Sequence, residues 1–188
     1  MSDESPALLR YLPAILGAVA AIASIIYVSI SFDGTDQDWE SLLGGVSDLK
    51  EAGELAEHVA VADENYAACI ATKSTVSILG AVEDSLKAAS EGECKIPDAS
   101  VDVSACIAWK DTAPSGADVP ATVELAILPV LALAGSAIDH SEDEAIQSWG
   151  SAVVDWIGSG KTSIIALIED PSTGSLSFDG VTVEGCRP

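Results

Sequence analysis

The chain has few basic residues: among 188 residues, eight Lys and Arg stand against 30 Asp and Glu, which gives a net charge of −22. Proteins that bind nucleic acids neutralise phosphates with Lys and Arg, so this balance argues against a nucleic-acid partner. It also argues against binding to anionic lipid surfaces. The excess of acid favours a saline environment or a basic partner, although solubility alone also accounts for it.

The sequence also lacks the motifs of the common catalytic and metal sites. There is no GxSxG, HExxH, CxxC or CxxCH pattern, and only two histidines are present, His58 and His140. Residues 158–162, GSGKT, resemble a phosphate-binding loop, but Asp155 stands where that loop needs its first glycine. We interpret 158–162 as a turn that ends a helix. The acidic runs 33–40 and 139–144 are typical of solvated helix starts. We therefore predict no catalytic residue, cofactor or metal.

Residues 11–31 contain no charged side chain and lie in the longest uncharged run of the sequence. About 20 apolar residues in a helix cross the hydrocarbon core of a bilayer, so this run predicts a transmembrane anchor within residues 1–32. Arg10 precedes the run and acids follow it, which predicts a cytoplasmic tail and an extracytoplasmic domain over 33–188. The alternative is a signal peptide cleaved after Ala23. The acidic first residues and the continuation of the apolar run to Ile30 favour the uncleaved anchor.

Small residues recur at helical spacing within the predicted anchor. Such residues on one face allow a neighbouring membrane helix to approach closely. This pattern predicts a helix-packing face, and the alternative is an alanine-rich span without a special face. The residues are Ala14, Gly17, Ala21 and Ser24.

All four cysteines follow the anchor, at positions 69, 94, 106 and 186. An even number of cysteines in an oxidising compartment predicts two disulfides. Four cysteines allow three connectivities. Because Cys94 and Cys106 are closest in sequence, we expect the pairs Cys94–Cys106 and Cys69–Cys186.

The part of the domain from 36 to 158 has mostly helical spacing of apolar residues. We expect a short first helix interrupted at Gly44–Gly45, and a restart of helix at Asp63 or Asn65. A kink or short strand is expected at 72–77, where Ser, Thr and Val disfavour helix. The apolar run 121–138 could span a membrane, but Glu124 and its short uncharged core favour a buried helix.

Two further patterns concern these helices. Residues 68–75, ACIATKST, resemble 105–112, ACIAWKDT, which indicates either a repeated helical hairpin or a chance similarity. Ser141 and Glu144 have the spacing of a capping box before a helix. We expect the tryptophans to lie in the core or at partner contacts, with Trp39 near the membrane interface. They are Trp39, Trp109, Trp149 and Trp156.

The last segment, 163–184, reads as β-structure. Residues 163–170 are rich in β-formers, 175–178 read as a short strand, and Asp179–Gly180 is a strong hairpin signal before 181–184. We therefore predict a three-stranded antiparallel meander packed on the helices. The expected class is α+β, mainly α.

These features favour a non-catalytic, single-pass protein of the cell membrane. We expect its domain to lie on the periplasmic or extracellular side and to serve as an accessory or structural subunit of a larger membrane assembly. The expected partners are other membrane-protein subunits, contacted through the anchor and the acidic domain. The alternative is a tethered domain that binds a solute or a cation.

Overall fold

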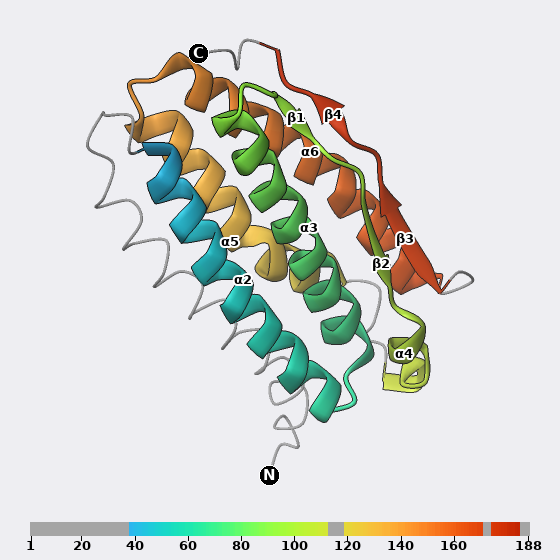
Figure 1. Ribbon diagram of the computed structural model, residues 1–188. Coiled ribbons are helices and arrows are strands. Elements are labelled where there is room, and N and C mark those ends of the chain that lie inside the picture. The colour runs from blue at the N-terminus through green and yellow to red at the C-terminus, as the bar shows by residue number, and fades with distance from the viewer. Residues whose placement is uncertain (1–37, 113–118, 171–173, 185–188) are drawn as a thin grey trace.

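The computed structural model describes residues 38–112, 119–170 and 174–184. Four long helices lie side by side along one axis in Figure 1. The mainly helical class is confirmed. The predicted anchor, 1–32, lies outside the described residues. The helices are α2 (Asp38–Ala62), α3 (Tyr66–Ser90), α5 (Val119–His140) and α6 (Glu144–Glu169). Helix α2 is antiparallel to α3, helix α5 is antiparallel to α6, and α3 and α5 run in the same direction.

Helix α2 continues through Gly44–Gly45, so the predicted interruption there is wrong. Leu42, Val46 and Leu49 are spaced three and four apart and are at most 1% exposed. Burial of a large aliphatic side chain contributes about 1.5–3 kcal/mol, whereas each glycine costs a helix about 1 kcal/mol. The burial of this face therefore outweighs the low helix propensity of the two glycines.

Helix α3 begins where the sequence predicts, at a cap formed by Asn65. The Asn65 side chain accepts a hydrogen bond from the N–H of Ala68 at 3.0 Å. The predicted kink at 72–77 is absent, and α3 is continuous there. The hydroxyls of Thr72 and Thr75 donate to the carbonyls four residues earlier, at 2.7 and 2.9 Å. These residues therefore satisfy their polar groups without leaving the helix.

Helices α5 and α6 are each long and apolar enough to cross a membrane, but buried core helices meet the same criterion. Within the most apolar part of each helix, 44% of α5 and 39% of α6 is buried inside the protein. The predicted helix over 121–138 corresponds to α5, which contains Pro129. One side of α5 packs on the other helices, as expected for a core helix.

Helix α6 is longer than predicted at its C-terminal end. It extends through 158–160 and 163–169, so neither the helix-ending turn nor the first strand of the meander exists. Ile157, Ile164 and Ile168 recur at helical spacing and are buried, which keeps the β-favouring run in the helix. At the N-terminus the cap is Asp143 rather than Ser141, since the Asp143 carboxylate accepts from the N–H of Ala145.

The strands form two antiparallel pairs instead of the predicted meander. Strand β1 (Lys95–Ile96) pairs with β4 (Val181–Thr182), and β2 (Ala99–Asp102) pairs with β3 (Ser175–Phe178). The two pairs share one register. Lys95 opposes Thr182, and Ala99, four residues later, opposes Phe178, four residues earlier. The four strands therefore follow one two-stranded ribbon, which runs along α3 and α6 (Figure 1).

Asp179–Gly180 lies in the middle of this ribbon and is not a hairpin turn. The break in the ladder falls at Pro97, which has no N–H to donate. The N–H of Gly180 instead donates to the carboxylate of Asp98 at 2.5 Å. A Cβ on Gly180 would lie 2.6 Å from the carbonyl oxygen of Ile96, so the close approach of the two chains requires glycine here.

A single large apolar cluster joins the four helices and the ribbon. Trp149 is 1% exposed and donates its indole N–H to the hydroxyl of Ser85 at 2.9 Å, which links α6 to α3. Trp156 is also buried, so the core prediction is confirmed for both. Trp39 is partly buried and packs edge-on against Trp149, with ring centroids 6.4 Å apart. Trp109 is partly buried against the same cluster.

Candidate functional site

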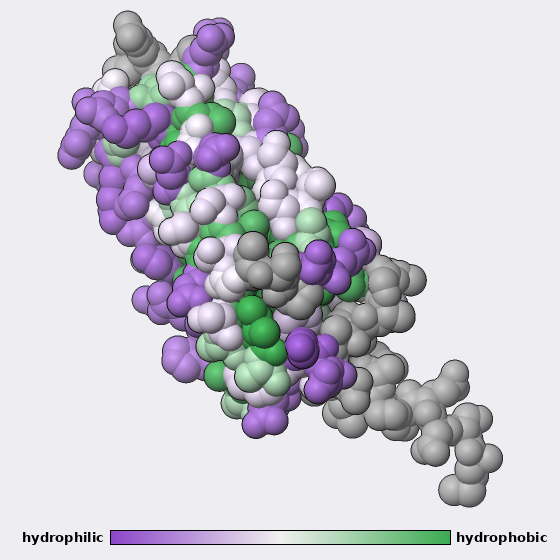
Figure 2. All heavy atoms as spheres, turned by 90° about the vertical axis from the view of Figure 1, so that its right-hand side faces the viewer, coloured by the Kyte–Doolittle hydropathy of each residue, from purple (hydrophilic) through white to green (hydrophobic). Residues whose placement is uncertain are grey.

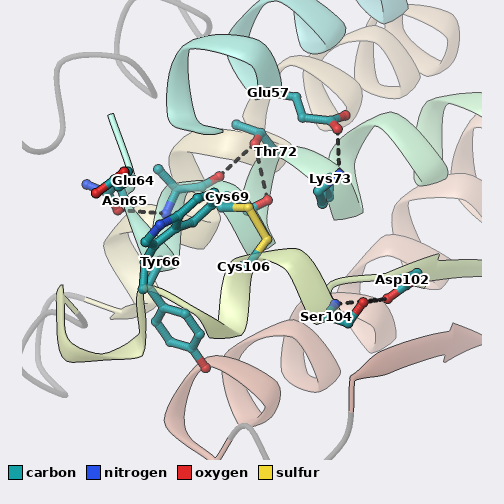
Figure 3. Close-up of a disulfide and its surroundings, with 12 residues drawn as sticks. Glu57, Glu64, Asn65, Tyr66, Cys69, Thr72, Lys73, Asp102, Ser104 and Cys106 are labelled. Carbon is teal, nitrogen blue, oxygen red and sulfur yellow. Dashed lines mark hydrogen bonds and ion pairs between the residues drawn. A yellow bond between two sulfur atoms is a disulfide. The ribbon is translucent and has the colours of Figure 1, made fainter. Parts of the chain in front are cut away.

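A disulfide joins Cys69 of α3 to Cys106 of the short helix α4 (Ser104–Ile107), with the two Cα atoms 5.7 Å apart (Figure 3). The predicted pairs Cys94–Cys106 and Cys69–Cys186 are therefore both wrong. Proximity in sequence misled the prediction, because extended strands lie between Cys94 and Cys106. The six strand residues of β1 and β2 alone span roughly 20 Å, far beyond the reach of a disulfide.

The two similar segments, 68–75 and 105–112, meet at this disulfide, and their cysteines are 37 positions apart. The second segment covers α4 and the 3-10 helix η1 (Lys110–Thr112), whereas the first lies in the 25-residue α3. They are therefore not two equal helical hairpins. The hydroxyl of Thr112 accepts the N–H of Tyr66 at 3.0 Å, so the second segment helps to cap the first.

The phenol of Tyr66 anchors the start of α3 to the end of α6. It is 1% exposed and lies 3.3 Å from the carbonyl oxygens of Leu167 and Ile168, to which it donates. Burial raises the pKa of Tyr66, and the negative charge of Asp170 raises it further. The phenol is thus a structural donor rather than an acid or base poised near neutral pH.

A groove of about 520 Å³ lies between α6 and the β3–β4 segment. Its floor is aromatic: Trp156 packs edge-on against Phe178 with ring centroids 6.0 Å apart, and its indole N–H donates to the carbonyl of Asp179 at 2.8 Å. A Cβ on Gly160 would lie 2.8 Å from the Phe178 ring, so this glycine brings the strand close to α6. The lining residues are Ala152, Asp155, Trp156, Ser159, Gly160, Ser163, Ser177, Phe178, Asp179, Val181 and Thr182.

The polar groups of this groove are hydroxyls and carboxylates. Asp155 and Ser159 are exposed on α6, and Asp179 is exposed on the ribbon. Figure 2 views the side of the molecule that carries α6 and the ribbon, and shows pale to green surface in the middle with hydrophilic side chains on both sides of it. The volume suits a small ligand. The carboxylates and hydroxyls that line the groove can accept hydrogen bonds from a hydroxylated or cationic group.

The outward side of α5 is a second candidate surface, which we call the α5 face: Leu125, Leu128, Ala132 and Gly135. These positions follow the helical repeat, and Leu128 is 43% exposed while the other three are half-buried. Two charged side chains of α5 border this face: Glu124, which pairs with Lys161 of α6 at 2.5 Å, and the exposed Asp139, one turn beyond Gly135. The α5 face is thus an apolar stripe that the described helices leave uncovered.

Helix α2 carries the opposite kind of surface. Its exposed side chains include a series of acids, and one exposed leucine, Leu55, lies among them at 64% exposure. The acids are Glu40, Asp48, Glu51 and Glu54. Where α2 meets α3, Lys73 pairs with Glu57 at 2.7 Å and Lys50 pairs with Glu83 at 3.5 Å. The charge on α2 is therefore balanced only along its contact with α3.

The two histidines lie apart from each other. Nδ1 of His58 is 2.7 Å from the carbonyl of Glu54, and His140 is exposed at the end of α5. Residues 158–162 lie inside α6, so they do not form a phosphate-binding loop. Within 38–112, 119–170 and 174–184, no group of three or more His, Cys, Asp or Glu residues is placed to hold a metal ion.

Sequence reasoning did not find the groove or the α5 face. The groove combines a helix with a strand that was predicted to turn back on itself at Asp179–Gly180. Gly160 was a usable signal, since the absence of a side chain there lets the strand approach α6. The predicted helix-packing residues Ala14, Gly17, Ala21 and Ser24, and Cys186, lie outside the described residues.

Comparison with protein-family models, with curated proteins and with solved structures finds no match for this chain.

Proposed function

We propose that this protein is a non-catalytic accessory or structural subunit of a membrane assembly. In this proposal the run 11–31 anchors it in the cell membrane, and the acidic helical domain lies on the periplasmic or extracellular side. The observation that carries the proposal is the α5 face. We assign its occupant as an apolar helix of another membrane-protein subunit.

The chemistry of α5 supports this assignment. Its most apolar part has a mean hydropathy of 1.9, yet less than half of that part is buried inside the protein. An exposed apolar stripe bordered by polar residues is typical of a surface that another protein covers. Ala132 and Gly135 are small, which lets a partner helix approach closely.

The rest of the domain agrees with an extracytoplasmic location. Disulfides persist in oxidising compartments and are rare in the cytosol, and the domain carries the Cys69–Cys106 bond. An anchor would also confine the domain to the membrane surface, which raises its effective concentration toward a membrane partner. A weak apolar contact then suffices for stable assembly.

The test is extraction of the full chain from its native membrane in a mild detergent. The molar mass of the complex is measured by size-exclusion chromatography with light scattering. We expect a complex larger than one chain, and we expect Leu128→Glu to release the subunit because it places a charge in the apolar contact. A photo-crosslinker at position 128 should join the chain to one defined membrane subunit.

Leu55→Glu is the matched control, since it places the same charge at a more exposed leucine on the acidic side of α2. It should leave the complex intact. The proposal fails if the wild-type chain is monomeric in the native extract, or if both variants dissociate the complex equally.

The groove between α6 and the ribbon favours a second candidate function, a tethered domain that binds a small hydroxylated or cationic solute. Its volume of 520 Å³ lies in the range of small-molecule sites, and Trp156 forms part of its wall. Titration of the domain with amines and polyols should then change the tryptophan fluorescence. Asp155→Asn should weaken binding of cationic solutes only. An unchanged spectrum with every solute would contradict this function.

A further inference from the structure

We propose that Asp179 is a latent site of isoaspartate formation, which the fold keeps closed by clamping the peptide bond between Asp179 and Gly180. The inference goes beyond the proposed function and does not depend on it. It rests on contacts that this peptide bond and Gly180 make with Trp156, Asp98 and Ile96.

The pair Asp179–Gly180 is chemically reactive. The backbone nitrogen of Gly180 can attack the side-chain carboxyl carbon of Asp179 and close a cyclic imide, a succinimide. Glycine favours this step because it has no Cβ to hinder the attack and because its backbone adopts many conformations. The side chain of Asp179 is exposed, so water reaches the carboxyl group. When the new carbon–nitrogen bond forms, the hydroxyl of the protonated carboxyl leaves with the amide proton as water.

Water then opens the imide at one of its two carbonyl groups. Attack at the side-chain carbonyl restores aspartate. Attack at the main-chain carbonyl gives isoaspartate, in which the chain runs through the side-chain carbon and gains one methylene. One water leaves and one enters, so the reaction needs no oxidant, reductant or other reactant. The added methylene lengthens the ribbon at the point where its two chains approach most closely.

The structure holds both ends of this peptide bond. The peptide unit is planar, so the carbonyl oxygen of Asp179 and the N–H of Gly180 move together. The nitrogen can reach the side-chain carbon only if the unit rotates about the Cα–C bond of Asp179. The carbonyl oxygen accepts the indole N–H of Trp156 at 2.8 Å, and the N–H donates to the carboxylate of Asp98 at 2.5 Å. Rotation therefore breaks both hydrogen bonds at once.

The two anchors come from different parts of the fold. Trp156 belongs to α6, whereas Asp98 lies between β1 and β2 (Figure 1). Trp156 is 6% exposed and packs against Phe178, so its indole cannot follow a rotating carbonyl. Gly180 is confined as well, because a Cβ there would lie 2.6 Å from the carbonyl oxygen of Ile96. The clamp therefore opens only when the ribbon separates from α6 or when an anchor is removed.

The test measures the rate of isoaspartate formation at position 179. The full chain is incubated at neutral pH, either folded or unfolded in urea, and isoaspartate is quantified over weeks by electron-transfer mass spectrometry. We expect the folded wild type to react at least about tenfold more slowly than the unfolded chain, because two hydrogen bonds oppose the rotation. Folded Asp98→Ala should react about fivefold faster than folded wild type, and Trp156→Phe about threefold faster.

Two control variants isolate the hydrogen bond to Gly180. Asp98→Asn keeps an acceptor oxygen and should react at close to the wild-type rate. Asp102→Ala removes a similar bond in the same ribbon, to the N–H of Ser104 at 2.9 Å, and should leave the rate at Asp179 unchanged. Urea denaturation of each variant gives its unfolded fraction, and the acceleration in Asp98→Ala should exceed the increase in that fraction.

Three results would overturn the proposal. The first is an equal rate in folded and unfolded wild type. The second is an acceleration in Asp98→Ala that matches Asp102→Ala or its own unfolded fraction. The third is a slower reaction in Asp98→Ala, which would make Asp98 a base that takes the amide proton. If Asp98→Ala does not fold, the wild-type comparison and Trp156→Phe still decide the outcome.

Discussion

The α2–α3 and α5–α6 hairpins have similar helix lengths and the same antiparallel arrangement, but they are held together differently. Two ion pairs cross between α2 and α3, Lys50–Glu83 and Lys73–Glu57. Between α5 and α6 the backbones approach closely: a Cβ on Gly150 would lie 2.8 Å from the carbonyl oxygen of Ala134. The α2–α3 contact thus has two ion pairs at its edge, whereas the α5–α6 contact has the pair Lys161–Glu124 and also depends on the absence of a side chain at Gly150.

The outer surfaces of the two hairpins differ in the same way. The outward side of α2 is acidic and well hydrated, whereas the α5 face is apolar. An apolar face that remains outside a bundle signals a partner more strongly than an acidic one, because water solvates acids at little cost. Helices of similar length and topology can thus serve solubility in one hairpin and association in the other.

The largest effect should come from the Cys69–Cys106 disulfide. Within the described residues, this covalent link belongs to the α2–α3 hairpin, and the α5–α6 hairpin has none. Replacing Cys69 and Cys106 together by serine should lower the free energy of unfolding by about 4 kcal/mol, because the unfolded chain regains the freedom of a loop of 37 residues. Urea denaturation followed by circular dichroism measures this. If the free energy of unfolding fell by less than about 1 kcal/mol, the disulfide would not restrict the unfolded chain as expected.

The close approach in the α5–α6 hairpin should be the next most sensitive. Gly150→Val places a branched side chain against the Ala134 carbonyl and should destabilise the protein by roughly 2–4 kcal/mol, since backbone must move to admit it. Gly158→Ala is the matched control in the same helix, where a Cβ meets nothing within 4 Å. It should stabilise α6 by about 0.5–1 kcal/mol. Equal thermal stability of both variants would refute this account of the contact.

The link between the two hairpins should have an intermediate effect. Ser85→Ala removes the acceptor of the buried Trp149 indole N–H, which joins α6 to α3. We expect a loss of roughly 1–2 kcal/mol, because a buried donor without a partner retains its desolvation cost. The variant should also shift the emission of Trp149. Ser77→Ala, at an exposed hydroxyl that donates to the Ser100 carbonyl at 3.0 Å, is a milder control.

The charged rim of the α2–α3 hairpin should have the smallest effect, and it should depend on pH. The hydrogen bond from Lys87 lowers the pKa of Glu83 below its usual value of 4.5, and Lys50 lowers it further. A lowered folded pKa adds stability that is complete above about pH 4.5 and is lost as pH falls through the folded value. Glu83→Gln should remove this part of the pH dependence at a cost below about 1 kcal/mol at neutral pH.

Salt distinguishes this rim from the contact between α5 and α6. High ionic strength screens exposed charges, so it should narrow the stability difference between wild type and Glu83→Gln. It should leave the difference between wild type and Gly150→Val unchanged. A salt-independent effect of Glu83→Gln would show that Glu83 acts through packing.

Much of the helical part was predictable because burial and capping leave local signals. The helix at 121–138 was identified from spacing and residue type, and the cap of α3 was narrowed to Asp63 or Asn65, of which the structure selects Asn65. The prediction of a first strand at 163–170 was wrong because the β-favouring residues in this segment also follow a helical repeat. Propensities differ by less than about 1 kcal/mol per residue, so the longer apolar stripe of α6 decides the outcome.

The candidate surfaces were less accessible to prediction because each depends on distant segments. The groove needs α6 and β3–β4 in contact, and the α5 face is recognisable only when the other side of α5 is known to be covered. The cysteine pairing had three solutions, and proximity in sequence favoured one that the structure contradicts. Only the position of α4 beneath the start of α3 selects Cys69–Cys106.

The sequence by itself determined the acidic balance, the uncharged run 11–31, the mainly helical class and the start of a helix at Asp63 or Asn65. These depend on residue type and on spacing within one segment. The tertiary structure decided that 163–169 is helix, that Asp179–Gly180 lies within a ribbon, and that Cys69 bonds Cys106. Each of these depends on contacts between segments far apart in the chain, and the free energy of burying them exceeds the local preferences that pointed elsewhere.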